Sequence, residues 1–168
     1  MIINLIGPPA VGKSTFASRF VLEHPEFKFC SIDAYRVEHD NEEIAWQNLF
    51  KDVIENKNVI LESCGLSWRL EDIFRTCSVR KRNTVTISFT GKYDDIYKRL
   101  AERQHKRPVN YKYDMSDEFA AITWVLEHIH ESKQPIDIEV STSEYTIEEQ
   151  YQFLCEYIAL KRVEEKQE

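Results

Sequence analysis

The sequence predicts a three-layer α/β/α domain built on a mostly parallel, five-stranded sheet. Short apolar runs alternate with amphipathic segments of helical periodicity, and the first apolar run ends in a glycine-containing loop. Strands that alternate with helices in this way form parallel sheets with right-handed crossovers. The length of 168 residues is enough for one domain with a sizeable core.

The five expected strands are short and rich in apolar or β-branched residues. The first, Ile2 to Ile6, is almost entirely apolar, which is typical of a strand buried on both faces of a parallel sheet. The others are expected at Phe27 to Ile32, Val59 to Glu62, Thr84 to Phe89 and Ile136 to Val140.

The expected helices repeat apolar residues at three- and four-residue spacing. One lies between the glycine loop and Pro25, and Pro108 prevents another from continuing past Arg107. The others are expected at Asn41 to Asn56, Trp68 to Thr76, Asp94 to His105, Asp117 to Glu131 and Ile147 to Ile158. We therefore expect a single domain over residues 1–163, a helical lid around 94–115 and a solvated tail at 164–168.

Composition narrows the class of protein. No apolar run approaches the length of a membrane span, and no basic-then-apolar leader precedes the first strand. The four cysteines form no Cys-x-x-Cys pair, and the histidines are scattered. We expect a cytoplasmic protein with reduced thiols and no histidine metal cluster.

Charge is distributed unevenly along the chain. Residues 75–112 contain eleven Lys or Arg and three acids, whereas the remainder contains eleven bases and twenty-six acids. A positive field over this stretch, including Arg80 to Arg82, would attract an anionic ligand such as a nucleic-acid strand.

The phosphate-binding motif G-x-x-x-x-G-K-[ST] follows the first strand directly and precedes a helix. It consists of Gly7, Pro8, Pro9, Ala10, Val11, Gly12, Lys13 and Ser14, with Thr15 next in sequence. Backbone N–H groups of such a loop converge on phosphate oxygens, and the helix dipole adds to their field. The motif predicts ATP binding, with Lys13 at the β- and γ-phosphates, Ser14 on Mg²⁺ and Thr15 at the α-phosphate.

Two other interpretations of the motif were weighed. A glycine turn that caps a helix without a ligand would not explain why two of the four glycines lie in this loop. A regulatory GTPase would carry Asn-Lys-x-Asp, whereas Asn56, Lys57 and Asn58 are followed by Val59. A non-catalytic NTP-binding module remains an alternative to an enzyme.

The segment after the second strand contains Asp33 and Arg36. Because ligands of open parallel sheets bind at the carboxyl ends of the strands, Asp33 is positioned to take a proton from an acceptor hydroxyl. Arg36, three residues later, would share a helical face with it and hold the acceptor. The structural alternative is that Asp33 caps a helix and pairs with Arg36.

Two further features belong to the expected site. Glu62 ends the third strand and is a candidate for the water shell of Mg²⁺, or alternatively for bonds to loop amides. Arg99, Arg103 and Arg107 recur at four-residue spacing and could close over the triphosphate. A solvated, salt-bridged helix with Asp95 paired to Arg99 is the alternative.

The chain resembles the P-loop kinases that include phage-type polynucleotide 5′-hydroxyl kinases and, more distantly, shikimate, gluconate and adenylate kinases. The resemblance covers Ile2 to Arg107 and lies in the phosphate loop, in Asp33-Ala34-Tyr35-Arg36 and in Lys98, Arg99 and Arg103. It implies that Asp33 and Arg36 activate and bind the acceptor, and that Arg99 and Arg103 hold ATP phosphates. It also implies that Ser141 to Ser143 border the adenine.

The sequence departs from this group at several points. Ala10 replaces a glycine common in such loops, Glu62 stands where many relatives have Asp, and no Asp-x-Asp-x-Thr phosphatase motif is present. The leading hypothesis is an ATP- and Mg²⁺-dependent kinase acting on a nucleic-acid 5′-hydroxyl end. The alternative is a nucleoside, nucleotide or small-metabolite kinase, which the lid-like Lys106-Arg107-Pro108 favours.

Overall fold

A computed structural model describes residues 1–104, 115–132 and 134–164. Its five strands are β1 (Ile2–Ile6), β2 (Lys28–Ser31), β3 (Val59–Glu62), β4 (Thr84–Thr90) and β5 (Ile138–Ser141). They form one sheet in the order β2-β3-β1-β4-β5, and all four pairings are parallel. The predicted fold class is confirmed, and the five strands lie within two residues of their expected ends.

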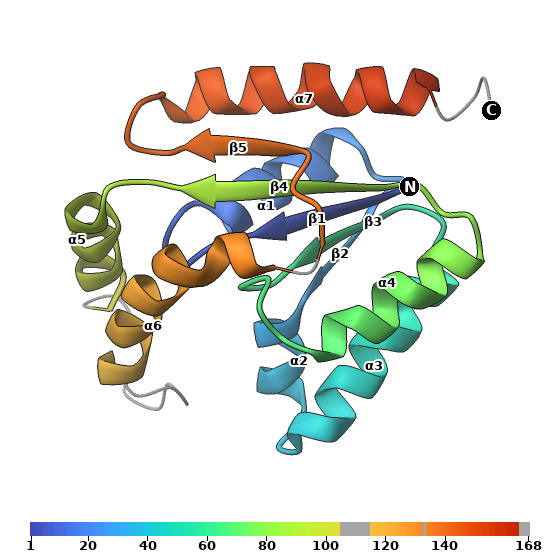
Figure 1. The fold of residues 1–168 in the computed structure, drawn as a ribbon, viewed down its shortest axis with the longest axis horizontal. Coiled ribbons are helices and arrows are strands. Elements are labelled where there is room, and N and C mark those ends of the chain that lie inside the picture. Colours follow the sequence, from blue (N-terminus) through green and yellow to red (C-terminus); the bar gives the residue numbers. More distant parts are fainter. Residues whose placement is uncertain (105–114, 133, 165–168) are drawn as a thin grey trace.

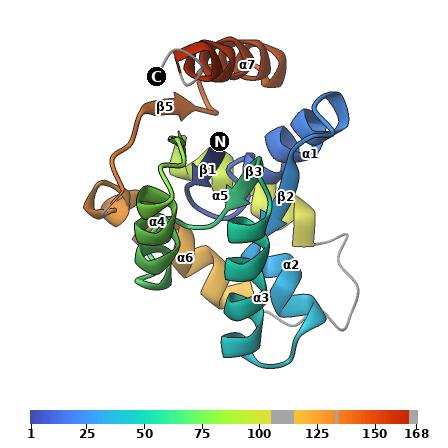
Figure 2. The same cartoon turned by 90° about the vertical axis from the view of Figure 1, so that its right-hand side faces the viewer.

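Helices cover both faces of the sheet, as Figures 1 and 2 show. The helices are α1 (Lys13–Glu23), α2 (Ile32–Glu38), α3 (Glu42–Glu55), α4 (Arg69–Val79), α5 (Tyr93–Gln104), α6 (Met115–His128), the 3₁₀ turn η1 (Ile129–Glu131) and α7 (Ile147–Glu164). α1 and α7 pack on one face, whereas α3 and α4 pack on the other. None of the described helices is long and apolar enough to cross a membrane.

The core is divided by the sheet because alternate strand residues point to opposite faces. Ile3 and Leu5 of β1 contact the α1 and α7 side, and Ile2 contacts the α3 and α4 side. All three side chains are completely buried. This packing holds the phosphate loop at the carboxyl end of a fixed central strand.

Two parts of the expected organisation differ from the structure. α2 is longer than the helical turn expected around Asp33 and Arg36, and it begins directly after β2 with Ser31 at the N-cap position. α7 continues to Glu164, beyond the expected helix end at Ile158, and residues 165–168 of the expected tail lie outside the described residues. The expected lid is described only as far as Gln104 in α5 and again from Met115 in α6, and Arg107 lies outside the described residues.

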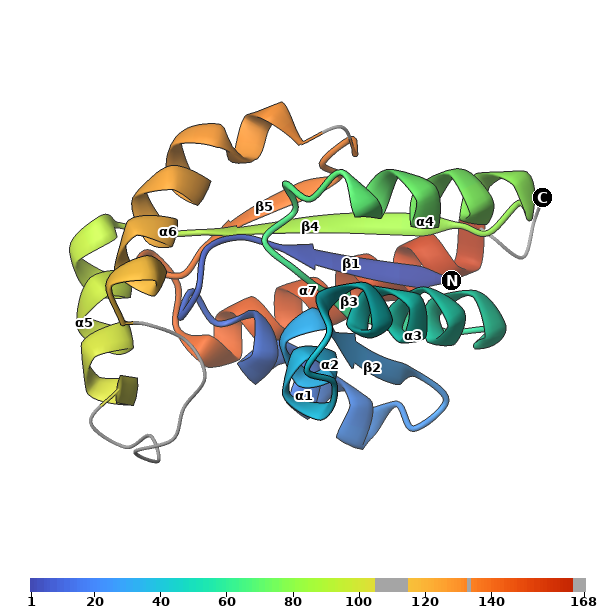
Figure 3. The ribbon, with the colours of Figure 1, turned by 90° about the horizontal axis from the view of Figure 1, so that it is seen from below.

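The positive stretch predicted over residues 75–112 is not one surface. Arg80 donates to Ile54 O at 3.3 Å, and Arg82 donates to the main-chain oxygens of Val53, Asn56 and Lys57. These contacts lie at the C-terminus of α3, beside the start of β4, whereas α5 follows the other end of that strand (Figure 3). Arg80 and Arg82 therefore lie at the opposite end of β4 from α5, so the positive residues of this stretch do not gather at one place on the described part of the chain.

Arg82→Ala is expected to destabilise the fold. It removes a charged donor from the last carbonyls of α3, and hydrogen bonds to charged groups contribute about 1.5–3 kcal/mol each. Urea unfolding should show a lowered free energy of unfolding, while Arg75→Ala, at an exposed ion pair with Asp72, should show little change. Equal stability of the two variants would contradict the capping role of Arg82.

Candidate functional site

The phosphate loop connects β1 to α1 and depends on backbone conformations that glycine adopts readily. Gly7 has φ of 140°, and a Cβ atom there would lie 2.3 Å from Phe89 O. Gly12 has φ of 118° immediately before α1. Any side chain at Gly7 would collide with β4, so this residue fixes how closely the loop lies over the sheet.

Ala10 adopts the left-handed conformation, with φ of 58°. This region costs a residue with a Cβ atom roughly 1–2 kcal/mol. The geometry explains why glycine is common at this position in similar loops.

Lys13 lies buried beneath the loop, with 7% of its surface exposed. Its Nζ donates to Gly7 O and Pro8 O, each at 2.8 Å. An ammonium has three donors, so one remains for an anion. Burial lowers the pKa of Lys13 below 10.5, while the carboxylates of Glu62 and Asp33 raise it. The site therefore holds a desolvated cation that an anionic ligand would stabilise.

Ser14 and Glu62, the two predicted metal-binding residues, lie together. Ser14 Oγ donates to Glu62 Oε1 at 2.7 Å, which joins the first turn of α1 to the end of β3. Glu62 is nearly buried, at 9% exposure. A hydroxyl and a carboxylate are oxygen ligands that suit Mg²⁺, whose remaining positions are usually filled by phosphate oxygens and water.

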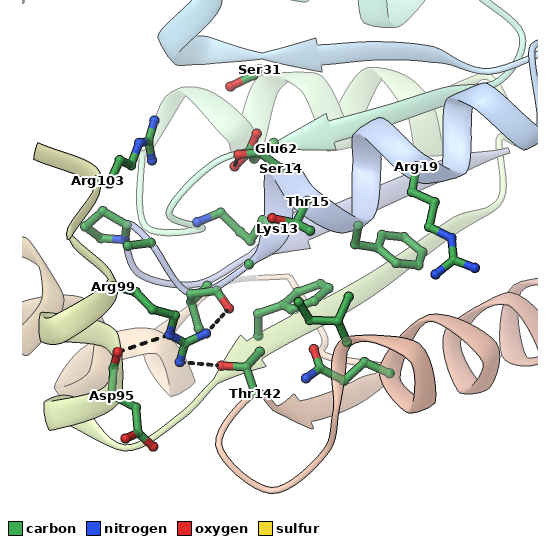
Figure 4. A pocket seen from close by; sticks show the side chains of 18 of the residues that line it. Lys13, Ser14, Thr15, Arg19, Ser31, Glu62, Asp95, Arg99, Arg103 and Thr142 are labelled. Atoms are coloured by element: carbon green, nitrogen blue, oxygen red, sulfur yellow. Dashed lines mark hydrogen bonds between the residues drawn. The ribbon is translucent and has the colours of Figure 1, made fainter. Parts of the chain in front are cut away.

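One cavity of about 1030 Å³ joins the phosphate loop to the other expected site residues. Figure 4 shows side chains from α1, α5, β3 and the loop after β5 converging on it. The lining residues that bear on the chemistry are Lys13, Ser14, Thr15, Asp33, Glu62, Arg99, Arg103 and Thr142. The structure thus brings together most of the side chains that sequence reasoning selected.

Asp33 and Arg36 are not equivalent in this arrangement. Asp33 lines the cavity, and its side chain is 65% exposed. Arg36 is absent from the lining; it donates to Asp33 Oδ1 at 3.1 Å and to both oxygens of Glu42 at 2.9 and 2.6 Å. Asp33 is the second residue of α2, so the N-cap alternative is wrong, although its expected pairing with Arg36 is present.

Arg99 and Arg103 project from α5 toward the cavity. Arg99 donates to Thr142 Oγ1 at 3.0 Å, to Val11 O at 3.4 Å and to the main-chain oxygen of Asp95 at 3.1 Å. Burial lowers the pKa of this guanidinium. The alternative of a side-chain ion pair between Asp95 and Arg99 is not what the structure shows, because the bond goes to the backbone. Arg103 has no hydrogen bond or ion pair within the described part of the chain.

No protein-family model matches the sequence, and no curated protein does. Among solved structures, shikimate kinase from Bacteroides thetaiotaomicron is similar over 95% of this chain and 98% of its own, with a TM-score of 0.65 and 19% identity. YorR from Bacillus subtilis, solved with phosphorylated GDP, is similar over 96% of this chain and 98% of its own, with a TM-score of 0.66 and 15% identity.

The fold is that of the P-loop kinases. A chain of the Pnkp1/Rnl/Hen1 RNA repair complex is also similar, with a TM-score of 0.58 and 21% identity over 75% of this chain and 45% of that one. At these identities the likeness establishes the fold. Placement in the polynucleotide-kinase subgroup, which the sequence resemblance suggested, is not confirmed.

Ser141 to Ser143, which the resemblance implies to border the adenine, lie at the end of β5 and directly after it. Thr142 and Ser143 line the cavity, whereas Ser141, the last residue of β5, is not among the lining residues. Ser143 Oγ accepts from Lys92 N at 2.8 Å, so the loops after β4 and β5 are joined. Arg99, which donates to Thr142, lines the cavity together with Thr142 and Ser143.

Sequence reasoning missed the side chains that hold α2 in place. Tyr35 OH donates to Asp52 of α3, and Lys28 of β2 pairs with the same carboxylate at 2.8 Å. Tyr35 lies in the segment that drew attention to Asp33, but its partner is seventeen residues away on another helix. No local pattern indicates that contact.

Proposed function

We propose that this chain is an ATP- and Mg²⁺-dependent phosphotransferase that moves the γ-phosphoryl group of ATP onto a hydroxyl of a small molecule. The observation that carries the proposal is the single cavity into which the phosphate loop, Asp33, Arg99 and Arg103 all open. A phosphate-binding loop alone would serve a nucleotide-binding module. A carboxylate and two arginines facing the same space supply what transfer to an acceptor requires.

The nucleotide is expected to lie along the loop and α1. Backbone N–H groups and the buried Lys13 would bind the β- and γ-phosphates, and the N-terminus of α1 adds a favourable dipole. Ser14 and Glu62 would hold Mg²⁺, which neutralises charge on the phosphates when bound. Arg99 and Arg103 would stabilise the charge that develops on the transferring oxygens.

Asp33 is proposed to receive the acceptor proton. Its carboxylate is exposed to the cavity. Arg36 donates a hydrogen bond to one of its oxygens and another to Glu42, which restrains the guanidinium. The remaining oxygen lone pairs can accept a hydrogen bond from an acceptor hydroxyl. A positioned base of this kind orients the hydroxyl and takes its proton as the phosphorus–oxygen bond forms.

The structure shifts the preferred acceptor from a nucleic-acid end to a small molecule. Arg80 and Arg82, which belong to the run expected to contribute to a strand-binding surface, donate to main-chain oxygens at the C-terminus of α3. Structures of small-molecule kinases match this chain over nearly its whole length, including a shikimate kinase from Acinetobacter baumannii solved with shikimate. Both observations favour the small-molecule alternative raised by the sequence.

Arg103→Ala and Arg99→Ala are expected to separate catalysis from stability. Arg103 has no described partner, so its loss should slow phosphoryl transfer without changing the melting temperature. Arg99 donates to Val11 O and Thr142, so its loss should lower both the rate of phosphoryl transfer and the melting temperature. Steady-state rates and thermal melts of the two variants test this. A destabilised Arg103→Ala with normal kinetics would assign Arg103 to structure.

Acceptor-dependent consumption of ATP tests the proposed function. The protein would be incubated with Mg²⁺ and ATP, and ADP formation followed with and without a panel of hydroxyl compounds. A phosphotransferase should release ADP faster when its acceptor is present. Tight ATP binding with no stimulation by any acceptor would instead indicate a non-catalytic nucleotide-binding module.

A further inference from the structure

An exposed tryptophan follows the expected metal-binding strand by six residues. Trp68 precedes α4 and is 66% exposed. The Arg69 guanidinium carbon lies 5.1 Å from the centroid of its ring and 5.9 Å from that of Trp46. The three side chains form a cluster of two indoles and one cation, which we term the Trp68 platform.

Acidic residues of α3 hold this platform in one arrangement. Arg69 Nη1 pairs with Glu43 Oε2 at 2.9 Å, and Trp46 Nε1 donates to Glu42 Oε1 at 2.8 Å. Trp46 is nearly buried, at 6% exposure. The Trp68 indole is therefore the exposed member of a cluster whose other members are fixed.

A chain of contacts connects the platform to the acceptor side of the cavity. Glu42, which binds Trp46, also binds Arg36, and Arg36 binds the cavity residue Asp33. The loop that leads from Glu62 to Trp68 is restrained at Gly65, where a Cβ atom would lie 2.8 Å from Ile6 Cβ. The platform thus sits at the carboxyl edge of the sheet, where α2, α3 and α4 meet (Figures 2 and 3).

The platform residues are not among those that line the cavity but lie beside its acceptor side, and the charges around them do not suit an acidic acceptor. Arg36 is paired with Asp33 and Glu42, and Arg69 is paired with Glu43. A carboxylate or phosphate on the acceptor would have to displace these acids. An aromatic ring, in contrast, can stack on Trp68 beside the guanidinium without breaking either ion pair.

We infer that the acceptor is a nucleoside whose base stacks on Trp68 while its sugar hydroxyl approaches Asp33. The inference rests on the proposed function. A bond forms between the sugar oxygen and the γ-phosphorus, the bond from that phosphorus to the β–γ bridging oxygen breaks, and ADP leaves with that oxygen. The hydroxyl proton passes to Asp33. Every base has a π-face, so stacking of this kind tolerates several bases.

Equilibrium binding to the full chain with Mg²⁺ and ADP tests the inference separately from turnover. Nucleosides and ribose would be titrated by calorimetry against the parent, Trp68→Ala and Trp68→Phe, with Trp124→Ala as the matched control. Trp124 is 49% exposed and stacks on His128 in α6, so it is a comparably exposed indole outside the cluster of Trp68, Arg69 and Trp46. Thermal melts confirm that each variant is folded.

We expect nucleosides to bind and ribose to bind far more weakly. Trp68→Ala should raise the nucleoside dissociation constant about tenfold or more, the scale of base stacking. Trp68→Phe should recover most of the affinity, and Trp124→Ala should match the parent. In turnover, Trp68→Ala should raise KM with little change in kcat.

Three results would overturn the inference. The first is an unchanged nucleoside affinity and KM in Trp68→Ala. The second is transfer to ribose or shikimate but to no nucleoside. The third is preferred transfer to a 5′-hydroxyl oligonucleotide whose affinity falls steeply with salt. Nucleoside binding that depends on Trp68 but gives no phosphorylated product would support the base site and contradict the phosphotransferase proposal. The two proposals can therefore fail independently.

Discussion

Lys13→Ala is expected to abolish phosphoryl transfer and to remove most ATP binding. The ammonium is desolvated and bonded to the loop carbonyls at 2.8 Å, so its charge is already in place before a phosphate arrives. Removing one preorganised donor from developing charge costs on the order of 10²–10³ in rate, and the loss of ground-state binding adds to this. Nucleotide titration and steady-state kinetics measure the two effects.

The fold should tolerate this substitution. Burial disfavours the charged form of Lys13 and lowers its pKa, and this desolvation cost offsets the hydrogen bonds that the ammonium makes to Gly7 O and Pro8 O. The melting temperature of Lys13→Ala should stay near that of the parent. Lys98→Ala removes another lysine of the cavity wall and should retain most activity. Near-normal turnover in Lys13→Ala would contradict the assignment of the phosphate loop.

Asp33→Asn is expected to lower turnover by roughly 10²–10⁴, the usual range for a positioned acid or base. The amide has nearly the same size, and its oxygen can still accept from Arg36. ATP affinity should therefore stay close to that of the parent while the chemical step slows. Single-turnover rates at saturating ATP and acceptor isolate that step.

Glu42→Gln is the matched control for Asp33→Asn. Glu42 binds the same Arg36 but is not among the cavity-lining residues, so it should affect the rate far less. An Asp33→Asn variant with an unchanged rate and a lowered melting temperature would show that Asp33 only orders the start of α2.

The sheet could be predicted from the sequence because each strand is a short apolar run between clear breaks. Gly7 marks the end of the first strand, and Pro25 marks the end of the helix that follows the phosphate loop. The apolar run at Ile2–Ile6 is typical of a central strand. The length of α2 could not be predicted, because its seven residues span only about two turns and show no repeated apolar spacing, so only a helical face shared by Asp33 and Arg36 was expected.

Site residues could be predicted where they belong to a known motif or stand at the end of a strand. Ser14 and Glu62 were selected independently, and their 2.7 Å contact brings them together. The placement of Arg82 was not predictable from charge counted along the chain. That count ignores the length of β4, which separates Arg82 from the basic residues of α5. The contact between Arg69 and Glu43 likewise joins two helices that no local spacing relates.

Transfer of label from γ-labelled ATP to a hydroxyl compound tests the central claim most directly. The protein would be incubated with Mg²⁺, labelled ATP and a panel of nucleosides, non-aromatic metabolites and 5′-hydroxyl oligonucleotides, and the products identified by mass. We expect a phosphorylated small molecule in the parent reaction and none with Lys13→Ala. Label that appears only as inorganic phosphate, or in no product, while ATP binds normally would contradict it.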